Sequence, residues 1–239
     1  MKLRLRPKFW IYPYKDGSNA AAKLAQAIGG RIIRRKNSKY RRQVRDYIIN
    51  WGSTDPLDGG RVINSYDGVG RATSKMETFR VLADANIQVP EWTRDHDQAC
   101  KWVGKGRLLG RDLDRGSRGL GITVYSKGSE VLKHQFYVRY VKKEREFRVH
   151  VMNGTVIFVQ EKMRKKEKVK DDYIRSHGNG WVFAFHHLEE QPVPQVALDT
   201  GVAAVRALGL DFGACDIAWS ANSGATVLEV NTAPGIEES

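Results

Sequence analysis

The sequence predicts a mixed α/β protein (α/β or α+β), and three observations support this prediction. Short strand-like runs alternate with helix-like segments through the first third of the chain. An Asn-Gly pair between two apolar-rich runs, at Asn153-Gly154, predicts a β-hairpin in the middle. Hydrophobic residues make up 41% of the 239 positions, which suffices for a buried core and excludes a mainly disordered chain.

The N-terminal region predicts a βαβ unit. Residues 9–12 have the composition of a strand, and 31–34 predict a second one. Between them, the apolar residues of 19–28 recur at i, i+3, i+4 and i+7, which is the spacing of one helix face. Two further strands are expected at 47–51 and 61–64.

The rest of the chain continues this mixture. A helix is expected from 74 to 86, because Thr73 and Ser74 can cap its first turn. The remaining expected elements are two strands within 108–124 around a glycine-rich loop, strands at 135–141, 147–152 and 156–163, a helix at 195–209, and two strands within 213–230. We expect three units, at 1–70, 71–130 and 131–239.

Charge is distributed unevenly. The formal net charge is +13, yet residues 1–50 hold 14 Lys/Arg and 2 Asp/Glu, whereas residues 171–239 hold 2 and 10. A basic N-terminal region fits nucleic acid or another polyanionic partner, and an ordinary solvated surface explains it equally well. The acidic C-terminal region fits cation binding.

Two function classes are excluded by what the sequence lacks. No apolar run reaches the ~20 residues of a membrane span, and the charged start lacks a signal-peptide core, so we expect a cytoplasmic protein with no membrane partner. Cys100 and Cys215 lie far apart without a Cys/His cluster, which excludes a disulfide scaffold and a cysteine-rich zinc site.

The most informative segment lies near the C-terminus. On a strand, alternate side chains share a face, so Glu229 and Asn231 should point one way while Leu228 and Val230 point into the core. A neighbouring strand would bring Asp216 alongside. Oxygen ligands of this kind suit Mg²⁺, whose remaining positions water and phosphate can fill. A polar face turned to solvent is the other interpretation.

A glycine-rich loop runs from Arg115 to Gly121 between two expected strands. Glycines let the backbone approach a polyphosphate, and Ser117 can donate to its oxygens. The loop fits neither a P-loop nor a Rossmann motif. Such a loop is also common as a plain hairpin connection, so both interpretations stay open.

Cationic side chains recur on the expected strands or at their ends. In the segment 146–151, Glu146, Arg148 and His150 share one strand face, and the intervening apolar residues share the other. This arrangement suits the sheet lining of an active site, although a half-exposed antiparallel sheet shows it too. The cations concerned are Lys75, Arg111, Arg148, Lys162, Arg164 and Arg175.

Taken in order, these pieces resemble the ATP-grasp carboxylate-amine ligases over roughly residues 60–236. The specific part is Asp216 followed by Glu-x-Asn-x-x-Pro-Gly, and the closest branch includes the ribosomal-protein glutamate ligases. The segment Ile49-Asn-Trp-Gly52 is similar to that of small viral members of this family. The other motifs are Ser74-Lys75, Val89-Pro90, Arg111 before the loop, Glu146-Phe-Arg-Val-His-Val151, Gln160-Glu-Lys-Met-Arg164 and Gly209 to Asp216.

The resemblance implies an ATP-grasp fold that holds ATP between the subdomains 71–130 and 131–239, preceded by a small α/β domain. It implies ATP and Mg²⁺ as cofactors. Residue by residue, it implies magnesium ligands at Asp216, Glu229 and Asn231, phosphate contacts from Lys75 and Arg111, a lid containing Ser117, Gly119 and Gly121, and adenine contacts at Val138, Tyr140 and Val141. Two departures are Arg111, where the family commonly has lysine, and Arg139, where an acidic hinge residue is usual.

The implied reaction joins a carboxylate to an amine through an acyl phosphate, with release of ADP and phosphate. Arg148 would clamp the carboxylate or acyl phosphate, Lys162 and Arg164 would contact phosphate, and Arg175 would hold a substrate. The expected partners are small-molecule or peptide-like carboxylates and amines. Nucleic acid or another macromolecular acceptor at the basic N-terminal region stays open. The alternative function is a non-enzymatic nucleic-acid-binding protein, and the expected location is the cytoplasm, of the host if the protein is viral.

Overall fold

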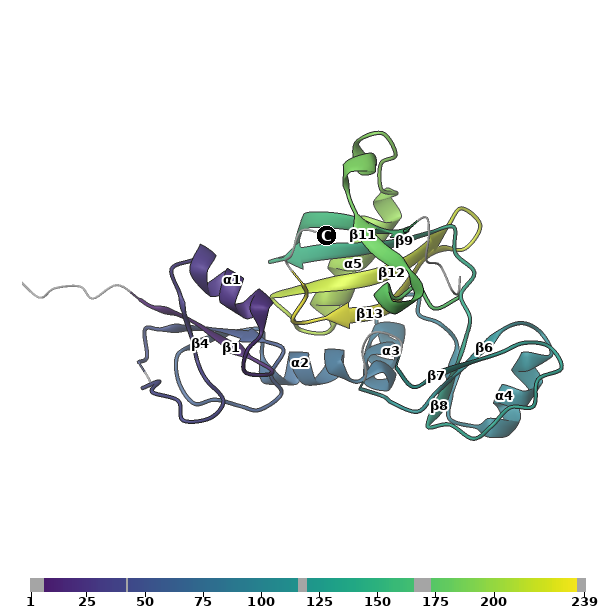
Figure 1. Cartoon of the computed structure of the whole chain (residues 1–239), viewed down its shortest axis with the longest axis horizontal. Coiled ribbons are helices and arrows are strands. Elements are labelled where there is room, and N and C mark those ends of the chain that lie inside the picture. Colours follow the sequence, from purple (N-terminus) through teal and green to yellow (C-terminus); the bar gives the residue numbers. More distant parts are fainter. Residues whose placement is uncertain (1–6, 42, 116–119, 166–172, 236–239) are drawn as a thin grey trace, which may run out of the picture.

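The computed structural model describes residues 7–41, 43–115, 120–165 and 173–235, and its strands form three sheets (Figure 1). The N-terminal sheet is parallel with the order β2-β1-β3-β4. Helix α1 (Asn19–Ala27) connects β1 to β2, so the predicted βαβ start is confirmed. The strands are β1 (Phe9–Pro13), β2 (Arg31–Ile32), β3 (Tyr47–Trp51) and β4 (Arg61–Ile63).

Two helices run from the N-terminal sheet beneath the central sheet (Figure 1). They are α2 (Tyr66–Thr73) and α3 (Lys75–Asp84), and Ser74 between them caps α3 by accepting from Glu77 N at 3.2 Å. The predicted start of α3 is therefore confirmed, but α2 was not predicted. Two glycines within α2 lower its helix propensity. One of them, Gly68, is needed because a Cβ there would lie 2.8 Å from the carbonyl oxygen of Gly209.

A second, antiparallel sheet has the order β5-β8-β6-β7. Its strands are β5 (Trp92–Thr93), β6 (Leu108–Arg111), β7 (Ile122–Tyr125) and β8 (Phe136–Arg139), and α4 (His96–Val103) packs on them. The predicted pair of strands around the glycine-rich loop is confirmed as β6 and β7. Because β8 pairs with β5 and β6, this sheet extends past residue 130, where we placed a subdomain boundary. The division into three units stays a prediction.

The central sheet is antiparallel with the order β11-β10-β9-β12-β13. Helix α5 (Gln195–Ala207) covers one face, where Phe147, Val149 and Val151 join the largest apolar core. The strands are β9 (Arg145–Met152), β10 (Thr155–Arg164), β11 (Trp181–Ala184), β12 (Phe212–Ser220) and β13 (Gly224–Asn231). Asn153 and Gly154 both have positive φ, as the predicted hairpin between β9 and β10 requires.

A β-bulge corrects the predicted alternation in β13. Asp216 pairs with Glu229 and Ile217 pairs with Val227, so Leu228 is an extra residue without a partner on β12. Val227 and Val230 are the residues that enter the apolar core, and Leu228 does not. The prediction that Leu228 points into the core was wrong, because a period of two does not hold across a bulge.

The N-terminal sheet is attached to the start of β12 through Asn64. This side chain accepts from the backbone N–H groups of Asp211 and Phe212 at 2.8 and 2.9 Å, and it donates to the Phe212 carbonyl at 2.9 Å. The Asn64 backbone N–H donates to the Asp211 carboxylate at 2.6 Å. Trp51 stacks on Phe212 at 5.3 Å, so apolar packing and hydrogen bonds hold the same joint.

Within the described ranges, none of the helices has the length and apolar character needed to cross a membrane.

Candidate functional site

The candidate site lies on the face of the central sheet opposite α5. Arg148 on β9 pairs across the sheet with Gln160 on β10 and Asp216 on β12, and Asp216 pairs in turn with Glu229 on β13. Directly paired residues of neighbouring strands share a face, so these four polar side chains form one row. The predicted division of the 146–151 segment into a charged face and an apolar face is confirmed by the core contacts of its apolar residues.

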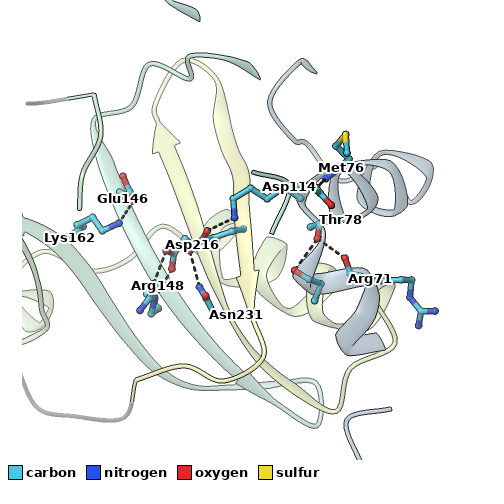
Figure 2. Close-up of polar contacts among 12 residues, drawn as sticks. Arg71, Met76, Thr78, Asp114, Glu146, Arg148, Lys162, Asp216 and Asn231 are labelled. Atoms are coloured by element: carbon cyan, nitrogen blue, oxygen red, sulfur yellow. Dashed lines mark hydrogen bonds and ion pairs between the residues drawn. The ribbon is translucent and has the colours of Figure 1, made fainter. Parts of the chain in front are cut away.

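The three predicted metal ligands lie together at this row. Asp216 is 4% exposed, and Arg148 donates to both of its oxygens, from Nε at 2.6 Å and from Nη2 at 2.8 Å (Figure 2). Glu229 accepts from Lys75 Nζ at 3.1 Å and from the amide of Asn231 at 3.2 Å. Each carboxylate is therefore neutralised by one cation of the chain itself.

The two carboxylates have different electrostatic surroundings. Burial raises the pKa of Asp216, and the Arg148 guanidinium opposes that rise. Burial also works to raise the pKa of Glu229, but the Lys75 ammonium outweighs it, and the pKa falls to about 2. Glu229 is therefore ionised at neutral pH and can serve as an oxygen ligand for a divalent cation.

Lys75 and Arg111 approach Glu229 from the other side of the site. Lys75 begins α3, whose first turn is held by Asp114, the acceptor for Met76 N at 2.9 Å (Figure 2). Arg111 ends β6, and burial lowers its pKa although the charges of Glu229 and Asp114 oppose this. Its buried Nε has no hydrogen-bond partner among the described residues. A buried donor without an acceptor fits an anionic ligand such as a phosphate.

A second group of cations surrounds Glu146, which is buried on the same face. Lys162 Nζ and Lys143 Nζ each lie 2.7 Å from one of its oxygens (Figure 2 shows the Lys162 contact). Lys162 and Arg148 both lie over the ring of Phe183, at 5.0 and 4.1 Å. The sequence did not single out Lys143, because its neighbours Lys142, Glu144 and Arg145 are charged as well.

The edge strand β11 adds two aromatic residues to this face. Phe183 pairs with Lys162 and Trp181 pairs with Arg164, which lies over the indole at 5.7 Å. Arg175 also lies over Trp181, at 4.4 Å, and its buried Nε has no hydrogen-bond partner among the described residues. The four predicted catalytic cations therefore line β9, β10 and the approach to β11. The strand β11 was not predicted, since its four residues are all apolar and show no alternation.

The predicted hinge connects β8 to β9. Val138 is buried against Phe79, whereas Tyr140 is half-buried and stacks edge-on against Tyr173 at 5.5 Å. The N–H groups of Arg139 and Tyr140 donate to backbone carbonyls of Glu91 and Arg107, at 2.8 and 3.0 Å. These two N–H groups are therefore already bonded within the protein. The adenine contacts at Val138, Tyr140 and Val141 stay a prediction.

The predicted lid is only partly described. Ser117 and Gly119 lie outside the described residues. Gly121 has a φ of +66°, and its carbonyl accepts from Asp112 N at 3.0 Å, which closes the base of the β6–β7 connection. Within the parts of the chain that are described, no group of three or more His, Cys, Asp or Glu side chains could hold a metal ion.

The arrangement of sheets is that of the ATP-grasp fold. The ATP-grasp ligase PsnB, solved with a minimal precursor, matches 98% of this chain and 93% of its own with a TM-score of 0.64 and 14% identity. The D-alanine–D-alanine ligase of Bacillus anthracis matches 97% of this chain and 88% of its own with a TM-score of 0.66 and 11% identity. PsnB has also been solved with Mg and ADP.

Sequence comparison adds one curated relative. A probable alpha-L-glutamate ligase of Halorhodospira halophila is 24% identical over 192 residues, which cover 73% of this chain. The chain spans 60% of the length of that relative. No protein-family profile matches the chain.

Proposed function

We propose that this protein is an ATP-dependent ligase that joins a carboxylate to an amine and releases ADP and phosphate. The observation that carries the proposal is a cluster of oxygen-bearing and cationic side chains on an ATP-grasp fold. The cluster consists of Asp216, Glu229, Asn231, Lys75 and Arg111. The probable glutamate ligase among its relatives supports this reaction type. The fold does not favour the alternative of a protein that only binds nucleic acid.

Two groups of residues would divide the binding of ATP. Asp216, Glu229 and Asn231 would hold magnesium, which when bound supplies positive charge to the phosphate oxygens. Lys75 and Arg111 would donate to the phosphates, and the unpartnered Nε of Arg111 fits that role. The adenine would lie near the hinge formed by Val138, Tyr140 and Val141, and Ser117, Gly119 and Gly121 would cover the phosphates.

The chemistry would use the cations of the central sheet. In the first step a carboxylate oxygen attacks the γ-phosphorus, the bond to the ADP oxygen breaks, and an acyl phosphate forms. In the second step the amine nitrogen attacks the acyl carbon, phosphate leaves with the bonding electrons, and the amine loses its proton. Both steps gather negative charge, which Arg148, Lys162 and Arg164 would stabilise, while Arg175 would hold a substrate.

The test begins with nucleotide binding. Calorimetry should show that the wild type binds Mg-ADP and that Asp216→Asn and Glu229→Gln weaken binding at least ~100-fold, since each loses a charged ligand. Glu77→Gln is the matched control, because Glu77 pairs with Arg80 on the exposed side of α3. Wild-type affinity in Glu229→Gln would refute the metal assignment. Products are then sought by mass spectrometry with ATP, glutamate or another amino acid, and candidate amines.

The basic N-terminal surface would recruit an acidic or polyanionic acceptor. We define this surface by its exposed cations Arg31, Arg34, Lys36, Lys39, Arg41 and Arg45. Arg35 beside them is paired with Asp55. Reversal of Arg34 and Arg41 to Glu should weaken salt-sensitive binding of a single-stranded oligonucleotide or polyglutamate while Mg-ADP affinity stays within a few-fold. If the wild type binds neither, or the reversal changes nothing, this surface is only solvated.

A further inference from the structure

The ion pair between Arg148 and Asp216 occupies the carboxylate that a metal would need. Nε and Nη2 of Arg148 lie 2.6 and 2.8 Å from the two oxygens of Asp216, so both oxygens are engaged. The side chains are 17% and 5% exposed, and the guanidinium is covered by the Phe183 ring at 4.1 Å. The pair is therefore a shielded, bidentate contact and not a loose surface pair.

A divalent cation and this guanidinium cannot share Asp216 in the same geometry. Both oxygens of Asp216 accept from the guanidinium, which reaches them from β9, whereas Glu229 lies on β13 at the other side of β12, so a metal held by both carboxylates would lie beside this fixed positive charge. Two positive groups at one shielded carboxylate also repel each other strongly, because the local dielectric constant is low. Metal binding at Asp216 and Glu229 therefore requires Arg148 to move.

The surrounding acids leave the displaced guanidinium without a second partner. Glu146 is already held by Lys143 and Lys162, at 2.7 Å each, and Glu229 is held by Lys75. Among the described residues of this face, Glu146, Asp216 and Glu229 are the acidic side chains that approach Arg148. A released Arg148 would stay beside Phe183 and Lys162 as a planar cation able to take two oxygens of an incoming anion.

We propose that metal–nucleotide binding displaces Arg148 from Asp216 and thereby opens a binding site for an oxyanion, the carboxylate or phosphoryl group of the second substrate. In the metal-free protein this site is closed by the ion pair itself. The inference rests on the proposed function, and it makes nucleotide binding a condition for binding of the carboxylate substrate at Arg148.

The first experiment measures Mn²⁺ binding without nucleotide, by the loss of the free Mn²⁺ signal in electron paramagnetic resonance at pH 8. Arg148→Gln removes the competitor, so Mn²⁺ should bind at least ~10-fold more tightly than to the wild type, and Arg148→Lys should give an intermediate value. Arg145→Gln is the matched control, because Arg145 lies on the same strand as Arg148 but pairs bidentately with Glu161 of β10 on the opposite face of the sheet. Unchanged or weaker binding in both Arg148 variants would overturn the proposal.

The second experiment observes Arg148 in the wild-type protein and uses a variant only to assign its signal. The Nε–H resonance of Arg148 in a proton–nitrogen spectrum, assigned by its loss in Arg148→Lys, should shift when Mg-ADP is added, because its acceptor changes. A resonance that stays in place while Mg-ADP binds would overturn the proposal and leave the ligase function standing. Absence of any Mg-ADP binding to the wild type would instead overturn both.

Discussion

The buried Glu146 carboxylate should be one of the most important charges for stability. It is 3% exposed and holds two ammonium groups, Lys143 and Lys162, at 2.7 Å. Glu146→Gln keeps the shape but leaves two shielded cations without a counter-charge. Loss of one partner of a buried ion pair costs about 3–5 kcal/mol, so we expect a loss in that range. For a chain of this length this lowers Tm by roughly 6–20 °C.

Urea unfolding followed by circular dichroism measures this loss directly. Glu144→Gln is the control, since Glu144 is exposed and its carboxylate accepts from Ala221 N at 3.3 Å, so its change should stay within about 0.5 kcal/mol. Adding Lys162→Met to Glu146→Gln removes one stranded cation and should recover at least ~1 kcal/mol. A Glu146→Gln loss below ~1 kcal/mol, or a double variant no more stable than the single one, would refute the argument.

Three further predictions concern other parts of the chain. Burial lowers the pKa of His150 in the folded protein, so the stability that depends on a neutral His150 is complete above the unfolded pKa near 6.5 and is lost as pH falls. The free energy of unfolding in urea should therefore fall less between pH 7 and pH 5 in His150→Gln than in the wild type. Gly52→Ala should lower the free energy of unfolding by about 2–4 kcal/mol and Gly17→Ala by ~1 kcal/mol, as thermal melting of both variants can measure. Both glycines have positive φ, but a Cβ at Gly52 would lie 2.9 Å from the Cβ of Ala233, whereas a Cβ at Gly17 would meet no atom within 4 Å. A thiol reagent should modify the exposed Cys100 quickly and Cys215 only on unfolding, since burial raises the pKa of the Cys215 thiol. Modification of two cysteines in the native protein would contradict this.

Most of the strands, though not β5 and β11, and the hairpin could be predicted because local sequence determines them. Asn153-Gly154 fixes the turn between β9 and β10, and the alternation from Glu146 to Val151 separates the site face from the core. Ser74 identifies the start of α3 through its hydrogen bond to the first turn. These signals act over a few residues, so they survive without knowledge of the tertiary contacts.

The missed features depend on contacts between distant segments. Helix α2 tolerates Gly68 only because the backbone at Gly209 lies against it. The bulge at Leu228 arises from pairing with β12, and the ion pair of Arg148 with Asp216 joins positions 68 residues apart. The motif resemblance placed Asp216, Glu229 and Asn231 together, but it did not indicate that chain cations already neutralise the two carboxylates.

The contacts of Asn64 determine which parts of the protein should unfold together. Its four hydrogen bonds to Asp211 and Phe212, together with the stacked Trp51, tie the first sheet to the strand that carries Asp216. Removal of the chain up to and including Asn64 would expose Phe212 and take away the acceptor of the Asp211 and Phe212 backbone N–H groups. The first sheet and the central sheet should therefore exchange their slowest amide hydrogens as one cooperative unit, and truncations intended to isolate a minimal catalytic domain should start upstream of this joint.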